Sequence, residues 1–214
     1  MNIPKILKRA AKDIQPGQII NLGIGLPTQL IAHLPDDMDV LIQSENGVLG
    51  AWKKAARDQA NPALIDAGGN YVTTRVGGSY FDSAVSFAMI RRSKLNMTMM
   101  GAFEVDRHGN LANWKIPGRF SPGIGGAMEL AQKTKNVIVL CTHNDKHGNP
   151  KILEQCTLPL TAPKCVTRII TDKAVMDVTE DGLLVVDIAD DITPDQLIAD
   201  TGADLIIPDT FGRF

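Results

Sequence analysis

Glu45 is the first residue in the chain whose type and setting could do chemistry. It follows the apolar run 40–42, which is short enough for a buried strand. The dipeptide Asn46-Gly47 comes directly after it and favours a tight turn with positive φ. Such a turn would present the carboxylate at the mouth of a sheet, where parallel α/β proteins place their chemistry. The alternative is a strand-to-turn junction with a solvated glutamate, and residues 42–47 alone leave both interpretations open.

A second candidate is the glycine-rich segment 122–129, which runs into a predicted helix. Backbone N–H groups at Gly125 and Gly126 would stand at the positive end of that helix, where they could bind an anion. The alternative is a close-packed helix start without a ligand, and the segment taken alone does not decide between the two.

The turn Gly23-Ile24-Gly25 follows the short apolar strand 19–22 and resembles the start of a dinucleotide fingerprint. The third glycine position of that fingerprint is occupied by Thr28. A nicotinamide dehydrogenase is therefore a weak alternative. A glycine turn that lets the backbone approach a ligand remains the better interpretation of Gly23 and Gly25.

Carboxamides near predicted strand ends, at Asn21, Asn46 and Asn113, could complete a site around Glu45. A carboxylate can act as a nucleophile when the leaving group is good and an oxyanion site is prepared. A thioester supplies that leaving group, and attack on it gives a mixed anhydride that thiolate can reopen. The acyl bond stays activated through this exchange if water is excluded.

Other catalytic and metal-binding patterns are missing from the sequence. It contains no Gly-x-Ser-x-Gly elbow, no P-loop and no closely paired cysteines. His143 and His147 are four residues apart, but Asp145 and Gly148 indicate a loop instead of a metal-binding helix face. We therefore expect no metal site.

Composition narrows the class of protein. The 214 residues are 44% hydrophobic and 21% charged, enough for one large or two small globular domains. A net charge of −2 and 5% aromatic residues give no reason to expect nucleic acid or an anionic membrane as a partner. Three cysteines, no secretory signal core and no apolar run near the ~20 residues of a membrane span indicate a soluble cytoplasmic protein.

The hydrophobic pattern alternates between helix and strand periods along the chain. We expect helices over residues 3–14, from 27, over 83–92, from 127, over 164–170 and from the capping box at Thr193. We expect strands over residues 19–22, 40–42, 71–76, 95–105, 137–141, 174–179, 183–188 and 205–207, with a polar surface segment over 53–61. This alternation favours a mainly parallel sheet covered by helices on both faces.

Three segments in this order resemble the β subunit of family I CoA-transferases. They are Asn-Leu-Gly-Ile-Gly-Leu-Pro-Thr (21–28), Gln-Ser-Glu-Asn-Gly (43–47) and Leu-Ala-Asn-Trp…Pro-Gly…Gly-Gly-Ala-Met (111–128). The stretch from Lys151 to Thr161 is also similar, so the resemblance covers essentially the whole chain. This group contains 3-oxoacid, acetoacetate/butyrate and 3-oxoadipate CoA-transferases, which serve ketone-body or short-chain fatty acid metabolism.

The resemblance implies a role for each matching residue. Glu45 would be the nucleophile, forming a glutamyl anhydride and then a glutamyl-CoA thioester in a ping-pong cycle. Gly126 would be the backbone oxyanion donor, and Asn21 an active-site carboxamide. The candidate substrate- and CoA-binding residues are Gly23, Gly25, Asn46, Gly47, Asn113 and Gly125, of which Asn46 and Gly47 would also shape the nucleophile turn.

The resemblance also implies a fold and partners. We expect one domain, 1–214, with the three-layer α/β/α arrangement and mainly parallel sheet shared by CoA-transferases and certain sugar-phosphate isomerases. CoA would be a substrate and covalent intermediate, with no permanently bound cofactor and no metal. The chain would need an α subunit of similar fold, in a hetero-oligomer such as α2β2 with the active site between the halves.

Two segments depart from the family pattern. Residues 51–54 are Ala-Trp-Lys-Lys where the family has a Gly/Pro-rich turn, and 92–94 are Arg-Ser-Lys where it has Gly-Gly-His. A basic lip there could suit a dicarboxylate acceptor or CoA phosphates, or be a solvated surface. Other functions stay open on this fold: a CoA-ester hydrolase, a sugar-phosphate isomerase with Glu45 as base, or a non-catalytic CoA-binding subunit.

Overall fold

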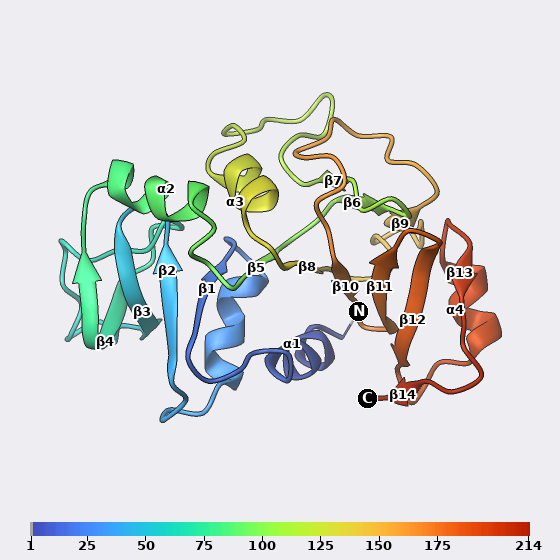
Figure 1. The fold of residues 1–214 in the computed structure, drawn as a ribbon, viewed down its shortest axis with the longest axis horizontal. Helices are drawn as coiled ribbons and strands as arrows, with labels where there is room; N and C mark the ends of the chain where they lie inside the picture. The colour runs from blue at the N-terminus through green and yellow to red at the C-terminus, as the bar shows by residue number, and fades with distance from the viewer. Residues whose placement is uncertain (1) are drawn as a thin grey trace.

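The structure is a computed structural model that describes residues 2–214, so residue 1 of the predicted domain lies outside the described residues. Within them, one eleven-stranded sheet runs through the molecule in the order β13-β12-β11-β10-β8-β5-β1-β2-β3-β4, with β14 also paired to β12. Figure 1 shows this sheet extending from β4 at one end to β13 at the other. The predicted α/β architecture with a mainly parallel sheet is confirmed.

Five parallel strands form the centre of the sheet. They are β2 (Val40–Ser44), β1 (Gln18–Leu22), β5 (Met97–Met100), β8 (Val137–Leu140) and β10 (Arg168–Ile170). Every residue of β5 and β8 is buried, as expected for strands that have both faces covered. The chain leaves β1 for β2 on one side and later returns to β5 on the other side of β1. The order of strands therefore reverses between β1 and β5, the kind of position at which open parallel sheets bind ligands.

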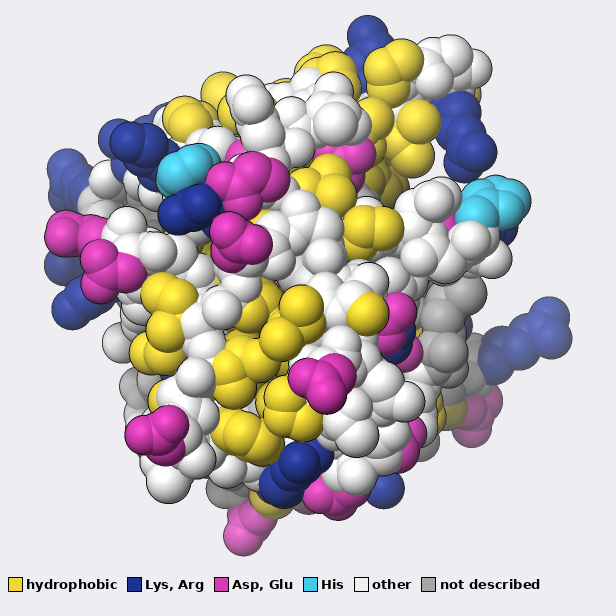
Figure 2. All heavy atoms as spheres, turned by 90° about the vertical axis from the view of Figure 1, so that its right-hand side faces the viewer, with side chains coloured by type: hydrophobic (Ala, Val, Ile, Leu, Met, Phe, Trp, Pro, Cys, Tyr) yellow, Lys and Arg dark blue, Asp and Glu magenta, His cyan; other side chains and the backbone are white. Residues whose placement is uncertain are grey.

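Antiparallel strands extend the sheet at both ends. They are β3 (Val48–Lys54), β4 (Val72–Tyr80), β11 (Ala174–Thr179) and β12 (Gly182–Ile188). The short strands β13 (Leu205–Ile206) and β14 (Gly212–Arg213) then pair with β12 in parallel. The predicted hairpin 174–188 is confirmed. Figure 2 looks at the end with β12, β13 and α4, where hydrophobic side chains gather and where Ile198 and Ile206 are exposed.

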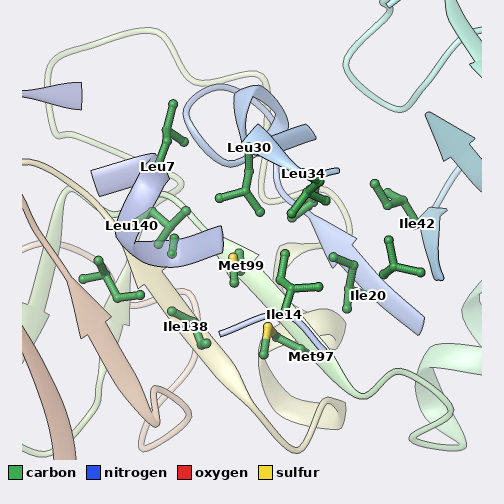
Figure 3. Packing of buried hydrophobic residues seen from close by; sticks show 14 of the residues in the cluster. Leu7, Ile14, Ile20, Leu30, Leu34, Ile42, Met97, Met99, Ile138 and Leu140 are labelled. Carbon is green, nitrogen blue, oxygen red and sulfur yellow. The ribbon is translucent and has the colours of Figure 1, made fainter. Parts of the chain in front are cut away.

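Helices cover both faces of the sheet. On one face lie α1 (Ile3–Ala11) and the 3-10 helix η1 (Pro27–His33), and on the other α2 (Ser83–Arg91) and α3 (Ala127–Lys133), which pack together at the top of Figure 1. Figure 3 shows Leu7 of α1 and Leu30 of η1 packed over Met99. Burial of such side chains, each contributing roughly 1.5–3 kcal/mol, holds the layers together. No helix within residues 2–214 is long and apolar enough to cross a membrane.

Caps account for the helix boundaries that the sequence predicted. Asp82 accepts a hydrogen bond from Val85 N at the start of α2, and Thr193 forms the expected capping box with Gln196 at α4 (Pro194–Asp200). Pro27 occupies the first position of η1, which is a 3-10 helix.

Two predicted elements were wrong, and one strand was missed. Residues 95–105 are not one strand, because the chain turns away after Met100 and β6 (Glu104–Asp106) joins a separate sheet with β7 (Leu111–Ala112) and β9 (Ile152–Leu153). Residues 164–170 are not helical, because Lys164 has φ 47° and β10 then pairs with both β8 and β11.

The third error concerns residues 48–54, which were not expected to form a strand. They form β3, the second strand of a hairpin whose first strand is β2. The predicted strand 71–76 also continues through its glycines to Tyr80. A β-carbon on Gly50 would stand 3.0 Å from the Cα atom of Gly78, so the two glycines allow β3 and β4 to approach.

Candidate active site

Glu45 lies in the turn between β2 and β3, at the carboxyl end of the parallel strands. The turn closes through a hydrogen bond from Gly47 N to Ser44 O, 3.0 Å long. Gly47 has φ 121°, and a β-carbon on it would stand 1.9 Å from the carbonyl oxygen of Phe81. Only glycine fits at this position, so the Asn-Gly signal in the sequence correctly located the turn.

A neighbouring loop supports the turn from its outer side. Asn46 donates its side-chain N–H to Ile65 O at 2.8 Å, and Ser44 Oγ accepts a hydrogen bond from Ala67 N at 2.8 Å. Asn46 was predicted to shape the turn, and its hydrogen bond to Ile65 O is a contact through which it can do so. Glu45 itself is half-buried.

Asn21 comes from the adjacent strand β1 and faces Glu45. Its Nδ2 lies 3.3 Å from Glu45 Oε2, a long hydrogen bond of the kind that shortens when a ligand completes a site. Asn21 is fully buried, so this contact is shielded from solvent. An amide N–H that donates to a carboxylate in this way restricts the orientation of the carboxylate.

Gly126, at the N-cap of α3, lies beside the stem of the Glu45 side chain. A β-carbon on Gly126 would stand 3.4 Å from Glu45 Cγ and 3.0 Å from Phe87 Cζ. Asn21 precedes Glu45 by 24 positions and Gly126 follows it by 81, and the fold brings the three together. Gly125 precedes Gly126, is exposed and has φ 54°.

The two glycines after β1 have different surroundings. Gly23 N donates to Met99 O at 2.8 Å, and a β-carbon on Gly23 would stand 3.2 Å from that oxygen, so Gly23 lets the ends of β1 and β5 meet. Gly25 is exposed with φ 99° and open space around it, and its carbonyl accepts a hydrogen bond from the Thr28 hydroxyl. The predicted glycine turn therefore directly follows the end of β1, two residues after Asn21.

Asn113 lies in the segment after β7. Its Nδ2 donates to Gly101 O at 3.0 Å, and its Oδ1 accepts from the Thr161 hydroxyl at 2.6 Å. Both ends of this amide therefore hydrogen-bond to neighbouring loops. Asn113 thus joins these loops, in addition to its predicted role in binding a ligand.

The sequence analysis did not identify Gln43 and Phe87 as site residues. Gln43 is the last but one residue of β2 and accepts a hydrogen bond from Asn21 at 2.9 Å through its side-chain oxygen. Phe87 of α2 contributes the ring edge beside Gly126. A buried polar residue inside an apolar strand is a signal for Gln43, whereas the position of Phe87 depends on how α2 packs against α3.

The two departures from the family pattern differ in exposure: Ala51 and Trp52 are buried in the core, with 3% and 8% exposed, whereas the basic residues of both segments lie at the surface. Lys53 forms an ion pair with Asp36, and Lys54 is exposed at the far end of the β2–β3 hairpin from Glu45. Residues 92–94 are exposed just beyond the end of α2. These basic residues therefore lie at the surface, which fits both interpretations left open, a basic lip for an anionic ligand and a solvated surface.

His143, one of the two histidines considered as metal ligands, has both ring nitrogens beside threonine hydroxyls. Among residues 2–214, no group of three His, Cys, Asp or Glu side chains is placed to hold a metal ion. His143 is fully buried, with Nδ1 and Nε2 each about 3 Å from a threonine hydroxyl, Thr171 and Thr201. Burial lowers the pKa of His143 to about 4, with a smaller contribution from the positive charge of Lys173.

Solved structures with the same fold are CoA-transferases and related enzymes. An acyl-CoA transferase from Escherichia coli O157:H7 matches all of this chain with a TM-score of 0.79 and 20% identity, over 43% of its own longer chain. The decarboxylase AibA/AibB matches 99% of this chain and 87% of its own, with a TM-score of 0.73 and 16% identity. At these identities the likeness shows the fold alone, and the fold is that of the CoA-transferases.

Sequence relatives narrow the class further. The β subunit of a probable coenzyme A transferase of Bacillus subtilis is 46% identical over 203 residues, covering 95% of this chain and 94% of its own. The β subunit of the acetate CoA-transferase of Haemophilus influenzae is 44% identical over 96% of this chain and 92% of its own. A 3-oxoadipate CoA-transferase chain of Acinetobacter baylyi is 43% identical over 94% of each chain. Residues 4–200 match the coenzyme A transferase family, and the chain belongs to it.

Proposed function

We propose that this chain is the β subunit of a hetero-oligomeric CoA-transferase and that it moves CoA from an acyl-CoA to a free carboxylate through a thioester on Glu45. The observation that carries the proposal is the convergence of Glu45, Asn21 and Gly126 at the carboxyl edge of the parallel sheet. The residues separately fit other functions, but a half-buried carboxylate between an amide and a glycine N-cap fits nucleophilic attack on a thioester.

The proposed reaction has two symmetrical halves. In the first, Glu45 attacks the thioester carbonyl, CoA leaves as thiolate and a mixed anhydride forms. The thiolate then attacks the glutamyl carbonyl, which releases the donor acid as its carboxylate and leaves glutamyl-CoA. In the second half the acceptor carboxylate attacks glutamyl-CoA, thiolate leaves, and thiolate finally takes the acyl group from the new anhydride. No proton or electron is gained or lost, and Glu45 is regenerated.

The neighbours of Glu45 have separate roles in this scheme. The Gly126 N–H is the proposed donor to the oxyanion formed during each attack. Asn21 holds the carboxylate, while Asn46 and Gly47 fix its turn. Gly23, Gly25, Asn113 and Gly125 are the proposed contacts for substrate or CoA. CoA serves as substrate and covalent intermediate, and the scheme needs neither a resident cofactor nor a metal.

The partner and the substrates are part of the same proposal. Relatives are named as β subunits, and this supports an α subunit as partner, in an α2β2 complex with the active site between the halves. Relatives of 44% and 43% identity are named for acetate and for 3-oxoadipate, so the acids proposed here are short-chain or 3-oxo acids. The cysteines are free thiols, the state favoured by the cytoplasm that we propose as the compartment.

A mass spectrum tests the covalent intermediate. The chain is purified from its native host with whatever binds it, mixed with acetoacetyl-CoA or succinyl-CoA, quenched and digested at mildly acidic pH. The expected result is a CoA adduct on the Glu45 peptide that is absent in Glu45→Ala and present in Glu180→Ala, a control at an exposed hairpin position.

Other outcomes favour the rival functions. Release of CoA and free acid without an acceptor, in the presence of the second chain, indicates a hydrolase. A preparation with the second chain that forms no adduct and moves no CoA contradicts the covalent mechanism, and an isomerase or a non-catalytic subunit then remains. A Glu45→Ala complex that keeps full function would favour the non-catalytic subunit.

A further inference from the structure

Three polar side chains form a row across the centre of the sheet. Thr98 of β5, Asn21 of β1 and Gln43 of β2 are direct cross-strand neighbours, because Asn21 pairs in register with both of the others. Side chains at paired positions of neighbouring strands point to the same face. The row therefore spans the switch point of the sheet, on three consecutive strands.

The row continues into helix α2. Thr98 Oγ1 donates to Asn21 Oδ1 at 3.1 Å, and Asn21 Nδ2 donates to Gln43 Oε1 at 2.9 Å. Gln43 Nε2 then donates to Ser86 Oγ at 2.7 Å. All four residues are at most 1% exposed, so the chain of hydrogen bonds is closed to water.

Three buried polar side chains in the sheet and a fourth in α2 are costly unless each is paired, and here each is. The strands around them are filled with Ile, Val, Leu and Met side chains that would pack there at lower cost. Packing therefore gives no reason for polar residues at these positions. The reason has to come from the groups that the row positions, the Asn21 amide and through it Glu45.

The row fixes which end of the Asn21 amide faces Glu45. Asn21 Nδ2 lies 3.1 Å from the main-chain oxygen of Gln43, an atom that can only accept a hydrogen bond. With Thr98 on Oδ1 and Gln43 Oε1 on Nδ2, the amide plane has contacts at both ends. Nδ2 has two N–H groups and three acceptors within 3.3 Å, so one N–H is shared between a Gln43 oxygen and Glu45 Oε2, 3.3 Å away.

We infer that Gln43 is a positioning residue for the nucleophile: anchored to Ser86 of α2, it holds the Asn21 amide in the orientation that presents an N–H to Glu45. The inference rests on the proposed function for its kinetic consequence. Gln43 touches no substrate in this scheme and acts through Asn21. The main-chain oxygen of Gln43 remains in any variant, so the test addresses the side chain alone.

Two substitutions at Gln43 separate positioning from bulk packing. Gln43→Met keeps the length of the side chain and removes both hydrogen bonds. Gln43→Glu in its protonated form reproduces both, with a carbonyl oxygen facing Asn21 and an O–H facing Ser86, whereas its ionised form cannot donate to Ser86 and places a charge near Glu45. Burial and the charge of Glu45 raise the pKa of such a carboxyl, so a pH series from about 5.5 to about 8.5 samples both forms.

In steady-state assays of the complete complex, we expect Gln43→Met to lower kcat about tenfold to a hundredfold with KM for acyl-CoA within about twofold, since a small misplacement of a catalytic group has effects of this size. The kcat of Gln43→Glu should approach the wild-type value at the acidic end of the series and fall toward that of Gln43→Met as pH rises.

Thr98→Val, which removes the contact to Asn21 Oδ1, should lower kcat in the same way. It replaces Gln43→Met in the test if that variant fails to fold. Thr134→Val, a buried hydroxyl outside the row, is the matched control.

The inference is overturned if Gln43→Met keeps kcat close to wild type, or if Gln43→Glu is no more active than Gln43→Met at the acidic end of the series. Absence of a Glu45 adduct in the wild-type complex would instead count against the proposed function. In that case a crystal structure of the Gln43→Met complex still decides the positioning role. A rotated Asn21 amide supports it, and an unmoved amide refutes it.

Discussion

Gly126 lies so close to Glu45 that a β-carbon on the glycine would stand 3.4 Å from Glu45 Cγ and 3.0 Å from the ring of Phe87. The φ angle of Gly126 is −78°, which any residue can adopt. The need for glycine at this position is therefore one of space beside the carboxylate and not of backbone conformation.

Gly126→Ala should consequently affect activity more than folding. The added methyl group would crowd the Phe87 ring at 3.0 Å and take up the space beside Glu45 Cγ at 3.4 Å, and we expect kcat to fall about tenfold to a hundredfold. The melting temperature should change little, because the backbone is unstrained. Gly101→Ala, with open space around its β-carbon, is the matched control for kcat and melting temperature. A Gly126→Ala complex as active as wild type would contradict the view that activity requires the close approach of Gly126 to Glu45.

Gly47→Ala should act on folding first. Its β-carbon would stand 1.9 Å from Phe81 O, and its φ of 121° is strained for alanine as well. We expect the free energy of unfolding to fall by more than about 2 kcal/mol in urea titrations. Gly17→Ala measures the backbone contribution alone, because Gly17 has φ 78° with nothing near its β-carbon, and should cost about 1 kcal/mol. Equal losses in the two variants would show that the Phe81 contact is unimportant.

The sequence predicted those parts of the fold and site that local signals encode. Asn46-Gly47 marked the turn that holds Glu45, and Asp82 and Thr193 marked helix starts through their caps. These features depend on residues a few positions apart, so they can be recognised without knowledge of the tertiary structure.

Features set by strand register could not be predicted in this way. The row of Thr98, Asn21 and Gln43 exists only because β5, β1 and β2 pair at those residues. The misassigned helix at 164–170 and the single strand at 95–105 have the same origin. A short apolar run does not say whether it will pair with a strand or which sheet it will join.

Asp13 provides a test of the ionic contacts between α1 and the sheet. Its carboxylate binds Arg9 at 2.6 Å and Arg168 at 2.9 Å, and only 10% of its side chain is exposed. Asp13→Ala removes a partner from two partly buried guanidinium groups, and we expect a loss of about 2–4 kcal/mol in the free energy of unfolding.

The matched control for Asp13 is Asp36→Ala. Asp36 pairs with Lys53 on the surface, with 79% and 43% of the two side chains exposed, and its removal should cost less than about 1 kcal/mol. Urea titrations at low and high salt would check both values, since the surface pair is the more strongly screened. Comparable losses in the two variants would contradict the assignment of Asp13 as a stabilising contact.

His143 gives the chain a defined dependence of stability on pH. Burial, and secondarily the charge of Lys173, lowers its pKa to about 4 in the folded protein, against about 6.5 in an unfolded chain. Between these values the unfolded state binds the extra proton and the folded state does not. The free energy of unfolding therefore rises with pH through this window, by about 3 kcal/mol from this residue, and the contribution is fully present above about pH 6.5.

Replacement of His143 by Gln tests this dependence on pH. Urea titrations at intervals from about pH 4.5 to about pH 7.5 should show a shallower slope of stability against pH for His143→Gln than for wild type, because the variant has no imidazole to protonate in the unfolded state. Replacement of the exposed His108 by Gln should leave the slope unchanged. Parallel curves for wild type and His143→Gln would contradict the lowered pKa, because they would mean that His143 binds its proton equally in the folded and unfolded states.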